Sequence, residues 1–440
     1  MTRASGLVWA PQIPNHWDVV PLNYVAKMGT GHTPDRNKSD YWQNCSIPWV
    51  TTPDVTRRPD SLAPLLETEQ HISELGMANS AAVLHPANTV MLSRTASIGY
   101  SVLIGRPMAT TQAFVTWTAG ATLDARYLLL VLRAMDPEWR RLAYGSTHLT
   151  IYMPDLETIR IPLPPLEEQR RIADFLGTET ARIDQLLALR FQQSAILSSR
   201  LSQIIDGATA ANVDALNAIG ISASVENWRM SKLSRLCEIV PGYAFPSSGF
   251  LTDGTGVRLL RGINVAPSAI SWREVVGWDV DSFPVPDRFH LRAGDLVVGM
   301  DRPWISEGAR VSLVSEMDLP ALLLQRVACL RPRGPIVMPY AYWALSSTHF
   351  RLSVESEMTG VSVPHLSGEQ IGRFAFHLPP SGLQLRISDA LACEAEQTNQ
   401  LKAAISRQVD LLAERRRALI TAAVTGQIDV STASGRGIED

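Results

Sequence analysis

Cysteine is scarce in this sequence. The 440 residues include four cysteines, Cys45, Cys237, Cys329 and Cys393, which form no C-x-x-C pair and have no histidine at zinc-ligand spacing. We therefore expect buried free thiols in a reducing compartment. Uncharged apolar runs of about 18 residues, the length of a membrane span, are also missing. The N-terminal segment lacks the apolar core of a signal peptide, so the sequence predicts a cytoplasmic protein that contacts no membrane.

The sequence also has no excess of positively charged residues. Lys and Arg number 40 against 43 Asp and Glu, which gives a formal net charge of −3. Bulk charge therefore offers no argument for nucleic acid, and any DNA contact has to come from local features. The composition is 45% hydrophobic and 19% charged, and a globular chain of this length has room for two or three packed domains.

Motifs of DNA-modifying enzymes are absent. Pro-Pro occurs only in Leu-Pro-Pro-Leu and Leu-Pro-Pro-Ser, whereas a base methyltransferase needs an Asp/Asn-Pro-Pro-aromatic loop for the extruded base. There is no G-x-x-x-x-G-K-[ST] phosphate loop. Asp155 and Glu157 resemble the paired carboxylates of a metal nuclease, but no Lys follows them, and acidic pairs at a helix start are usually caps. These absences predict a non-catalytic chain without a metal or cofactor of its own.

The chain repeats one plan twice. Matching residues recur in the same order in both halves, and their separation drifts by only four residues along the chain. Chance similarities would not keep that order, so the sequence predicts an internal duplication. The matching pairs are Trp17 with Trp228, Gly31 with Gly242, Tyr127 with Tyr340, and Gln169 with Gln384, at separations of 211, 211, 213 and 215 residues.

Each copy has two parts. Residues 1–155 and 213–370 are rich in Gly, Pro, Trp and short β-branched runs, which is typical of mixed domains with a substantial sheet. Proline pairs then precede long proline-free stretches, which predict helical regions at 156–212 and 371–440, the second with a C-terminal tail. The predicted fold class is α+β: two globular mixed α/β domains separated by two long antiparallel coiled-coil helices, related by a pseudo-two-fold internal repeat.

The two predicted helices carry apolar stripes at 4/3 spacing, the pattern of a helix-pairing seam. They run from Glu167 to about Ile205 and from Leu383 to about Val424, with Gly207 and Gly426 where each should end. An antiparallel rod of roughly 58 Å would satisfy both stripes; the alternative is that each helix packs on its own domain. The predicted pairing residues are Ile172, Leu176, Ile183, Leu186, Leu197, Ile387, Leu391, Leu401, Ile405 and Leu412.

Several loops carry residue types that contact DNA bases and phosphates. A single loop arginine is more often a solvated surface charge, and a loop tryptophan is more often core. Here, however, the framework repeats while the loops differ, as two readers of unlike half-sites would require. The predicted DNA-binding residues are His32, Thr33, Arg36, Lys38, Arg57, Arg58, Arg94, Thr95 and Gln112 in the first copy, and Ser247, Ser248, Arg261, Asn264, Arg302 and Gln325 in the second.

Four segments carry a resemblance to a known family. The run from Ile161 to Leu176 (IPLPPLEEQRRIADFL) and the run from Arg415 to Gly426 (RRRALITAAVTG) closely resemble the spacer helices of type I restriction-modification specificity subunits. The segments 29–42 and 241–248 look like entries to that family's target-recognition domains. The second signature departs from the pattern, since Ser-Gly-Leu-Gln replaces Leu-Glu-Glu-Gln at residues 381–384, which weakens residue-level transfer at that helix start.

The resemblance implies a sequence-specific DNA-binding subunit. In this family each target-recognition domain reads one half of a bipartite site in double-stranded DNA, the helices set the spacer, and two modification (methyltransferase) subunits dock on the assembly. Those partners would bind S-adenosylmethionine, and ATP- and Mg-dependent restriction subunits are further partners in such systems. We expect the apolar stretch 127–132 to need covering by partner subunits.

Two other functions remain open from the residues alone. A coiled-coil scaffold or interaction protein would use the helix pair to bind proteins and would show no DNA-sequence preference. A fused enzyme with an unrecognised motif would methylate or cleave DNA by itself. The duplicated order of domain and helix favours the DNA-reading subunit, because helices of matched length are needed only where spacing matters.

Overall fold

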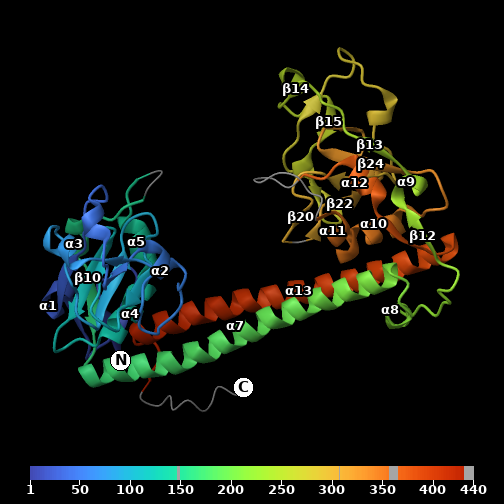
Figure 1. Ribbon diagram of the computed structural model, residues 1–440. Helices are drawn as coiled ribbons and strands as arrows, with labels where there is room; N and C mark the ends of the chain where they lie inside the picture. Colours follow the sequence, from blue (N-terminus) through green and yellow to red (C-terminus); the bar gives the residue numbers. More distant parts are fainter. Residues whose placement is uncertain (146–148, 307, 356–364, 431–440) are drawn as a thin grey trace. The chain divides into compact units, whose positions relative to one another are not determined.

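A computed structural model describes residues 1–145, 149–306, 308–355 and 365–430 (Figure 1). The chain divides into two compact units, one formed by Met1–Arg190 with Arg407–Asp440 and the other by Phe191–Ser406. Each unit holds one mixed α/β domain and a segment of each of two 44-residue helices, α7 (Leu166–Thr209) and α13 (Ser381–Val424). Part of the predicted tail, residues 431–440, lies outside the described residues.

The first domain contains short strands and helices joined by turns. In chain order they are β1 (Thr2–Ala4), β2 (Gln12–Pro14), β3 (Asp18–Pro21), α1 (Leu22–Val25), β4 (Ala26–Thr30), η1 (Ser39–Trp42), β5 (Ile47–Val50), α2 (Thr52–Thr56), β6 (His71–Ile72), α3 (Glu74–Ala78), β7 (Thr89–Ser93), β8 (Ser101–Leu103), β9 (Ala109–Thr110), β10 (Phe114–Ala119), α4 (Ala125–Ala134), α5 (Asp136–Leu142), α6 (Met153–Glu157) and β11 (Arg160–Leu163).

The second domain repeats this plan with additional short strands. Its elements are α8 (Val213–Ala218), β12 (Arg229–Lys232), α9 (Leu233–Leu236), β13 (Cys237–Pro241), η2 (Ser247–Gly249), β14 (Phe250–Leu251), β15 (Val257–Leu260), η3 (Gly262–Asn264), β16 (Val265–Ala266), β17 (Ala269–Ile270), β18 (Gly277–Trp278), η4 (Asp287–Phe289), β19 (Leu296–Gly299), β20 (Trp304–Ile305), β21 (Gly308–Ala309), β22 (Val311–Leu313), η5 (Glu316–Asp318), β23 (Ala321–Leu323), β24 (Val327–Pro332), α10 (Met338–Ser346), α11 (Thr348–Glu355), α12 (Gly368–Arg373) and β25 (Ala375–Leu378).

The sheets confirm the predicted duplication. The first domain has an antiparallel sheet in the order β4-β10-β7-β8, and the second has its counterpart in the order β13-β24-β19-β22. Beside each sheet lies one parallel pair, β5 with β9 and β15 with β23. A separate antiparallel pair closes each domain, β3 with β11 and β12 with β25. These closing pairs carry the domains to residues 163 and 378, past the predicted boundaries at 155 and 370.

The apolar stretch 127–132 is buried within its own domain, in contrast to the expectation that partner subunits cover it. It forms most of α4, which packs on β7, β8 and β10. All six side chains in the stretch are at most 2% exposed, and burying each is worth roughly 1.5–3 kcal/mol. The Asp124 carboxylate caps the helix by accepting hydrogen bonds from the N–H groups of Arg126 at 2.8 Å and Tyr127 at 3.2 Å.

A buried glutamine fastens each long helix to its domain. Gln169, the fourth residue of α7, is fully buried. Its Oε1 accepts a hydrogen bond from the Asp124 N–H at 2.9 Å. Its Nε2 donates to the carbonyls of Thr122 at 3.0 Å and Pro164 at 2.8 Å. Gln384 of α13 repeats these contacts with the Val337 N–H at 2.8 Å, the Pro335 carbonyl at 2.9 Å and the Pro379 carbonyl at 2.8 Å.

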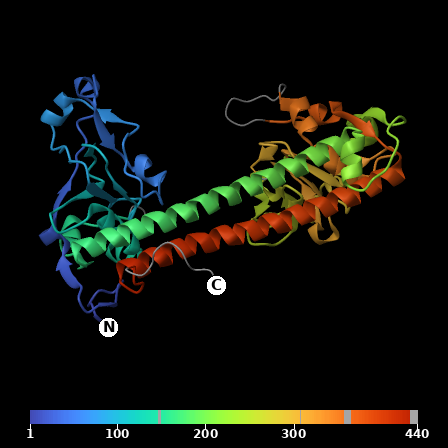
Figure 2. The same ribbon diagram turned by 90° about the horizontal axis from the view of Figure 1, so that it is seen from below.

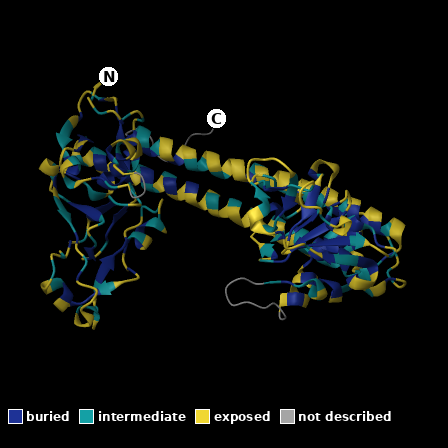
Figure 3. Ribbon diagram, turned by 90° about the horizontal axis from the view of Figure 1, so that it is seen from above, coloured by how far each residue is buried: buried dark blue, intermediate teal, exposed yellow. Residues whose placement is uncertain are grey.

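Within each unit the segments of α7 and α13 lie side by side and antiparallel (Figures 1 and 2). In the first unit Asp184 of α7 contacts Arg416 of α13. In the second, Leu201 and Thr398 line one small cavity between the helices. Figure 3 shows buried and exposed stretches alternating along both helices, as a narrow seam requires. The seam includes polar residues, because Thr180 and Thr398 are buried.

Two predicted seam positions are wrong. Leu186 is 44% exposed and Leu401 is 53% exposed. The seam alternates steps of three and four residues. Thr180 and Ile183 are buried and lie three residues apart, so the next seam position is Leu187, four residues further along α7. Because the seam passes through polar residues, apolar pattern alone placed it one residue off. Of the other predicted residues, Ile172, Leu176, Ile183, Ile387, Leu391 and Ile405 are buried, and Leu197 and Leu412 are partly buried.

The helix ends and the cysteines also differ in part from expectation. Gly426 follows α13 with a φ of 71°, a left-handed conformation that favours glycine at a helix end. Gly207 instead lies inside α7, where its missing side chain lets the helix approach Ala215 of α8. The four cysteines are free thiols, but only Cys237 and Cys329 are buried, and Cys393 is exposed on α13.

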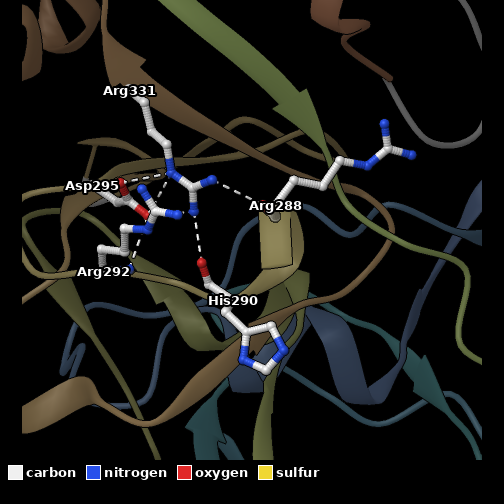
Figure 4. A network of polar contacts seen from close by, with 5 residues as sticks. All are labelled: Arg288, His290, Arg292, Asp295 and Arg331. Carbon is white, nitrogen blue, oxygen red and sulfur yellow. Dashed lines mark hydrogen bonds and ion pairs between the residues drawn. The ribbon is translucent and has the colours of Figure 1, made fainter. Parts of the chain in front are cut away.

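A buried ion pair braces the second domain (Figure 4). Arg331 in β24 contacts Asp295 with Nη2 and Oδ2 2.9 Å apart, and the side chains are 12% and 5% exposed. Arg331 also donates to the carbonyls of Arg288 at 2.9 Å and His290 at 2.7 Å. Burial opposes the charged form, but the hydrogen bonds and attraction of Asp295 outweigh it and raise the pKa of Arg331. The pair therefore ties the segment after η4 to the sheet.

Candidate nucleic-acid interface

Three loops of the first domain leave one edge of its sheet. The antiparallel register pairs Thr30 at the end of β4 with Val115, and Ser93 at the end of β7 with Phe114. The ends of β4 and β7 therefore meet the start of β10 at the same edge. Residues 31–38, 94–99 and 111–113 extend from this edge, which we call the first reading edge. The topology brings together predicted residues that are up to 80 positions apart in sequence.

A close backbone approach holds the first of these loops to the neighbouring parallel pair. A Cβ on Gly31 would lie 2.0 Å from the Thr110 carbonyl oxygen, so only glycine fits there. The next residue, His32, donates its N–H to the same carbonyl at 3.0 Å. The Thr110 hydroxyl in turn donates to the Val50 carbonyl at 2.9 Å. This chain of contacts joins β4, β9 and β5 at the reading edge.

The predicted side chains at this edge are largely accessible. His32, Arg36, Lys38 and Gln112 are exposed, and Thr33, Arg94 and Thr95 are partly buried. The Thr33 hydroxyl donates to Gln112 Oε1 at 2.8 Å, which links two of the loops. Exposed Arg, Lys, Thr and Gln side chains on a braced backbone can contact both base edges and phosphates.

Two tryptophans support Arg36. Its guanidinium carbon lies 5.4 Å from the ring centroid of Trp42 and 5.7 Å from that of Trp49, within cation–π range. Trp49 is buried and Trp42 partly buried, so these rings belong to the domain's packing and are not free platforms for stacking bases. They limit the positions that the Arg36 side chain can take.

Arg57 and Arg58 do not join the reading edge. Arg57 forms an ion pair with Glu69. Arg58 donates to the Ser61 hydroxyl at 3.2 Å and to the Ala63 carbonyl at 3.3 Å. Arg58 also lines a cavity of about 440 Å³ together with Asp184 of α7. Both arginines therefore have structural partners within the segment that follows α2, and Arg58 lies near α7.

The second domain has an equivalent reading edge. Pro241 at the end of β13 and Val298 in β19 both pair with Ala328 at the start of β24. A Cβ on Gly242 would lie 2.0 Å from the Leu324 carbonyl, the same close approach as that of Gly31. The predicted residues Ser247, Ser248, Arg302 and Gln325 leave this edge and are exposed. The scaffold is thus shared by the two domains, while the exposed residues differ.

Asn264 is a correction to the predicted set, because it is buried and its amide is already bonded. It is 1% exposed. Its Oδ1 accepts from the Arg261 N–H at 3.0 Å, and its Nδ2 donates to the carbonyls of Ser271 at 2.9 Å and Glu274 at 3.0 Å. Asn264 therefore caps η3 and cannot contact a base. Arg261 is partly buried and donates to the Glu274 carbonyl at 3.1 Å.

An acidic residue organises the second reading edge and was missed by sequence reasoning. Asp301 accepts hydrogen bonds from Arg326 at 2.5 Å and from His365 Nδ1 at 2.7 Å. Partial burial opposes the charged form, but these two bonds outweigh it and lower the pKa of Asp301. Arg326 is exposed beside Gln325, so adjacency to a predicted residue was the one available signal. His365 lies 64 residues from Asp301, a pairing that only the fold creates.

The described residues form neither a metal site nor a membrane-spanning helix. Among them, no three or more His, Cys, Asp or Glu side chains are arranged so that they could hold a metal ion. Within the same part of the chain, no helix has the length and apolar character needed to cross a membrane.

Comparison with known proteins gives a matching family model and several similar proteins. A family model described as the type I restriction modification DNA specificity domain matches residues 14–188. The EcoAI specificity subunit of Escherichia coli is 31% identical over 177 residues, which cover 40% of this chain and 30% of that subunit's length. The MjaVIII specificity subunit of Methanocaldococcus jannaschii is 22% identical over 428 residues, covering 95% of this chain and 94% of its own.

Solved structures share the fold along nearly the whole chain. A chain from a study of complex assembly and conformational transition of the type I R-M system superposes with a TM-score of 0.71 at 18% identity, covering 94% of this chain and 99% of that one. The HsdS subunit from Thermoanaerobacter tengcongensis superposes with a TM-score of 0.52 at 18% identity, covering 94% and 98%. Residues 14–188 therefore match a type I restriction modification DNA specificity domain, and along nearly its whole length the chain is similar to a type I restriction enzyme specificity subunit and shares the fold of the solved structures.

Proposed function

We propose that this chain recognises a bipartite site in double-stranded DNA, with each reading edge contacting one half-site. The observation that carries the proposal is the pair of equivalent edges. Gly31 and Gly242 make the same backbone approach in both domains, yet the exposed side chains that follow are unlike. A scaffold that is repeated in both domains with different exposed residues is what reading two different half-sites requires. The residues we assign to DNA contact are those exposed at the edges, with Arg326 added and Asn264 removed.

The proposal assigns no catalytic step to this chain. Two modification subunits would dock on it, bind S-adenosylmethionine and methylate adenine, and restriction subunits using ATP and Mg could join them. The chain itself would hold no cofactor and would act in the cytoplasm. The similarity to type I specificity subunits supports this division over the two alternatives, a coiled-coil scaffold without sequence preference and a fused enzyme.

Co-expression with the methyltransferase encoded beside it tests the proposal. Mapping methylated adenines across a genome by single-molecule sequencing is expected to reveal one bipartite motif with a fixed gap. Expression of the chain alone is the control and is expected to give no methylation. A continuous motif, or methylation without sequence preference, would contradict two-edge reading, and methylation by the chain alone would establish a fused enzyme.

The same assay tests the helices as the ruler between half-sites. A heptad insertion at facing positions of α7 and α13 keeps the seam in phase and lengthens the pair by about 10 Å, equivalent to about three base pairs. We expect the gap of the methylated motif to change while both half-sites stay the same. An unchanged gap in a folded, active complex would exclude the ruler mechanism.

A further inference from the structure

One buried arginine has no role in the function proposed so far. The side chain of Arg416 in α13 is 3% exposed, whereas its neighbours Arg415 and Arg417 are exposed. One guanidinium nitrogen contacts the Asp184 carboxylate of α7, and the other donates to the Asp60 carbonyl of the first domain. A single side chain therefore joins both long helices to the loop of residues 57–63, which we call the clamp loop.

A second guanidinium also contacts the clamp loop. Arg133 of α4 donates to the Ser61 carbonyl at 2.7 Å and to the Ser101 carbonyl at 3.3 Å. Burial, followed by the repulsion of Arg416, lowers the pKa of Arg133 to about 10. Two cations thus contact consecutive carbonyls of one loop. Each also keeps at least one buried N–H without a hydrogen-bond partner among the described residues.

This arrangement is a poor way to gain stability. Buried ion pairs are often no more stabilising than apolar side chains of similar volume, and a like-charge neighbour adds to their cost. What a guanidinium offers instead is fixed, directional donation to several acceptors at once. The contacts of Arg416 therefore favour a role in geometry, namely the placement of the clamp loop against the helices.

The clamp loop is connected to the first reading edge by a short, braced segment. Val50, the end of β5, accepts a hydrogen bond from the Thr110 hydroxyl at that edge. Residues 52–56 then form α2, whose start is fixed because the Asp54 carboxylate accepts from the N–H of the N-cap residue Thr51 at 2.8 Å and from its hydroxyl at 2.6 Å. Elsewhere, a cavity of about 440 Å³ separates the clamp loop from α7. The polar contacts of Arg416, together with the packing of Leu62 on the core that includes Ile172 of α7, therefore hold the loop to the helices.

The residue equivalent to Arg416 in the first copy is not an arginine. The separation of 215 residues that relates Gln169 to Gln384 also relates Leu201 of α7 to Arg416. An apolar leucine at this position cannot donate to a loop of the second domain. Any effect of the clamp on DNA reading should therefore be confined to one half-site.

We propose that Arg416 is a positioning residue that fixes the orientation of the first reading edge on the helix segments of its own unit, and thereby sets the selectivity of one half-site. The inference rests on the proposed function, because it concerns how one of the two edges is held. Arg416 contacts no DNA in this role and acts through Asp184, Asp60 and α2.

The test uses the full complex with its modification subunits and the methylation map as readout. Arg416→Met keeps the buried stem but removes all donors, and Arg417→Met is the matched control on the exposed side of the same helix. We expect Arg416→Met to lower the preference for the correct base by about tenfold at one or more positions of a single half-site, the scale of one base-pair contact. The other half-site and the gap should not change, and Arg417→Met should match the wild type.

Two conservative variants keep the test decisive if Arg416→Met does not assemble. Arg416→Lys retains the charge but cannot reach both acceptors in fork geometry, and Asp184→Asn removes only the half-exposed carboxylate. Both are expected to relax the same half-site to a smaller degree. Wild-type selectivity in every folded variant, or equal relaxation of both half-sites, would overturn the positioning role. Absence of a bipartite motif in the wild-type complex would instead contradict the proposed function itself.

Discussion

Gly31→Ala is expected to lower the free energy of unfolding of the first domain by about 3 kcal/mol, the upper range for overpacking a tight site. The added Cβ would lie 2.0 Å from the Thr110 carbonyl oxygen and 2.7 Å from Thr110 Cγ2. Backbone at that position cannot move without separating β9 from β5, because Thr110 is bonded to Val50. The substitution should therefore loosen the whole first reading edge.

Hydrogen exchange followed peptide by peptide is the appropriate measurement, since a chain of two units need not unfold in one step. We expect faster exchange in β4, β9 and β10 and wild-type exchange in the second domain. Gly242→Ala should produce the reciprocal pattern, because its Cβ would lie 2.0 Å from the Leu324 carbonyl. Gly177→Ala in α7 is the control: nothing lies within 4 Å of its Cβ, so a gain of up to about 1 kcal/mol is expected. Unchanged exchange in Gly31→Ala would refute this account.

Gln169→Ala is expected to destabilise the junction of α7 with the first domain by about 3 kcal/mol or more. Removal of the side chain leaves the Asp124 N–H and the carbonyls of Thr122 and Pro164 without their partner. Each buried backbone group left unpaired costs about 1–3 kcal/mol. Chemical denaturation should show a lower midpoint, and exchange should accelerate at the start of α4 and of α7.

Two further variants separate hydrogen bonding from packing. Gln169→Glu keeps the side-chain volume and the oxygen that accepts from the Asp124 N–H. It replaces the Nε2 group, which donates to two carbonyls, with an oxygen that cannot donate and would face both carbonyl oxygens. It should be at least as destabilising as the alanine variant. Gln185→Ala lies on the same helix at an exposed position, where alanine is a good helix former, and should change stability little. A Gln169→Glu protein as stable as wild type would show that volume alone matters at this position.

Features that depend on residues close together in sequence could be predicted, whereas features that depend on contacts between distant residues could not. The long helices were predictable because proline pairs and apolar periodicity are local signals, and they are observed within a few residues of the expected bounds. The seam was misplaced at Leu186 and Leu401 because it crosses buried Thr180 and Thr398. Polar seam residues carry no hydrophobic signal, so their position is set by the facing helix.

The candidate site likewise has features that were predictable from local sequence and features that were not. The loops that leave the reading edges could be selected because Gly-rich turns and polar loops are visible in sequence, and the sheet register brings these loops to one edge. Asn264 was selected for its chemistry, yet its amide is consumed by capping η3. Arg326 became a candidate because the fold leaves it exposed beside Gln325 at the reading edge. Whether a polar side chain is free or already bonded depends on neighbours distant in sequence.

The sequence by itself determined that the chain is duplicated, that each copy pairs a sheet-containing domain with a long helix, and which family it resembles. These features depend on repeated spacing, local propensity and a specific signature. Only the tertiary structure decided which loops share an edge, which arginines are bonded within the domain, and that Arg416 joins two helices to one loop. Such contacts bring together groups from tens to hundreds of residues apart, and they exist only once the packed core has placed the backbone that carries them.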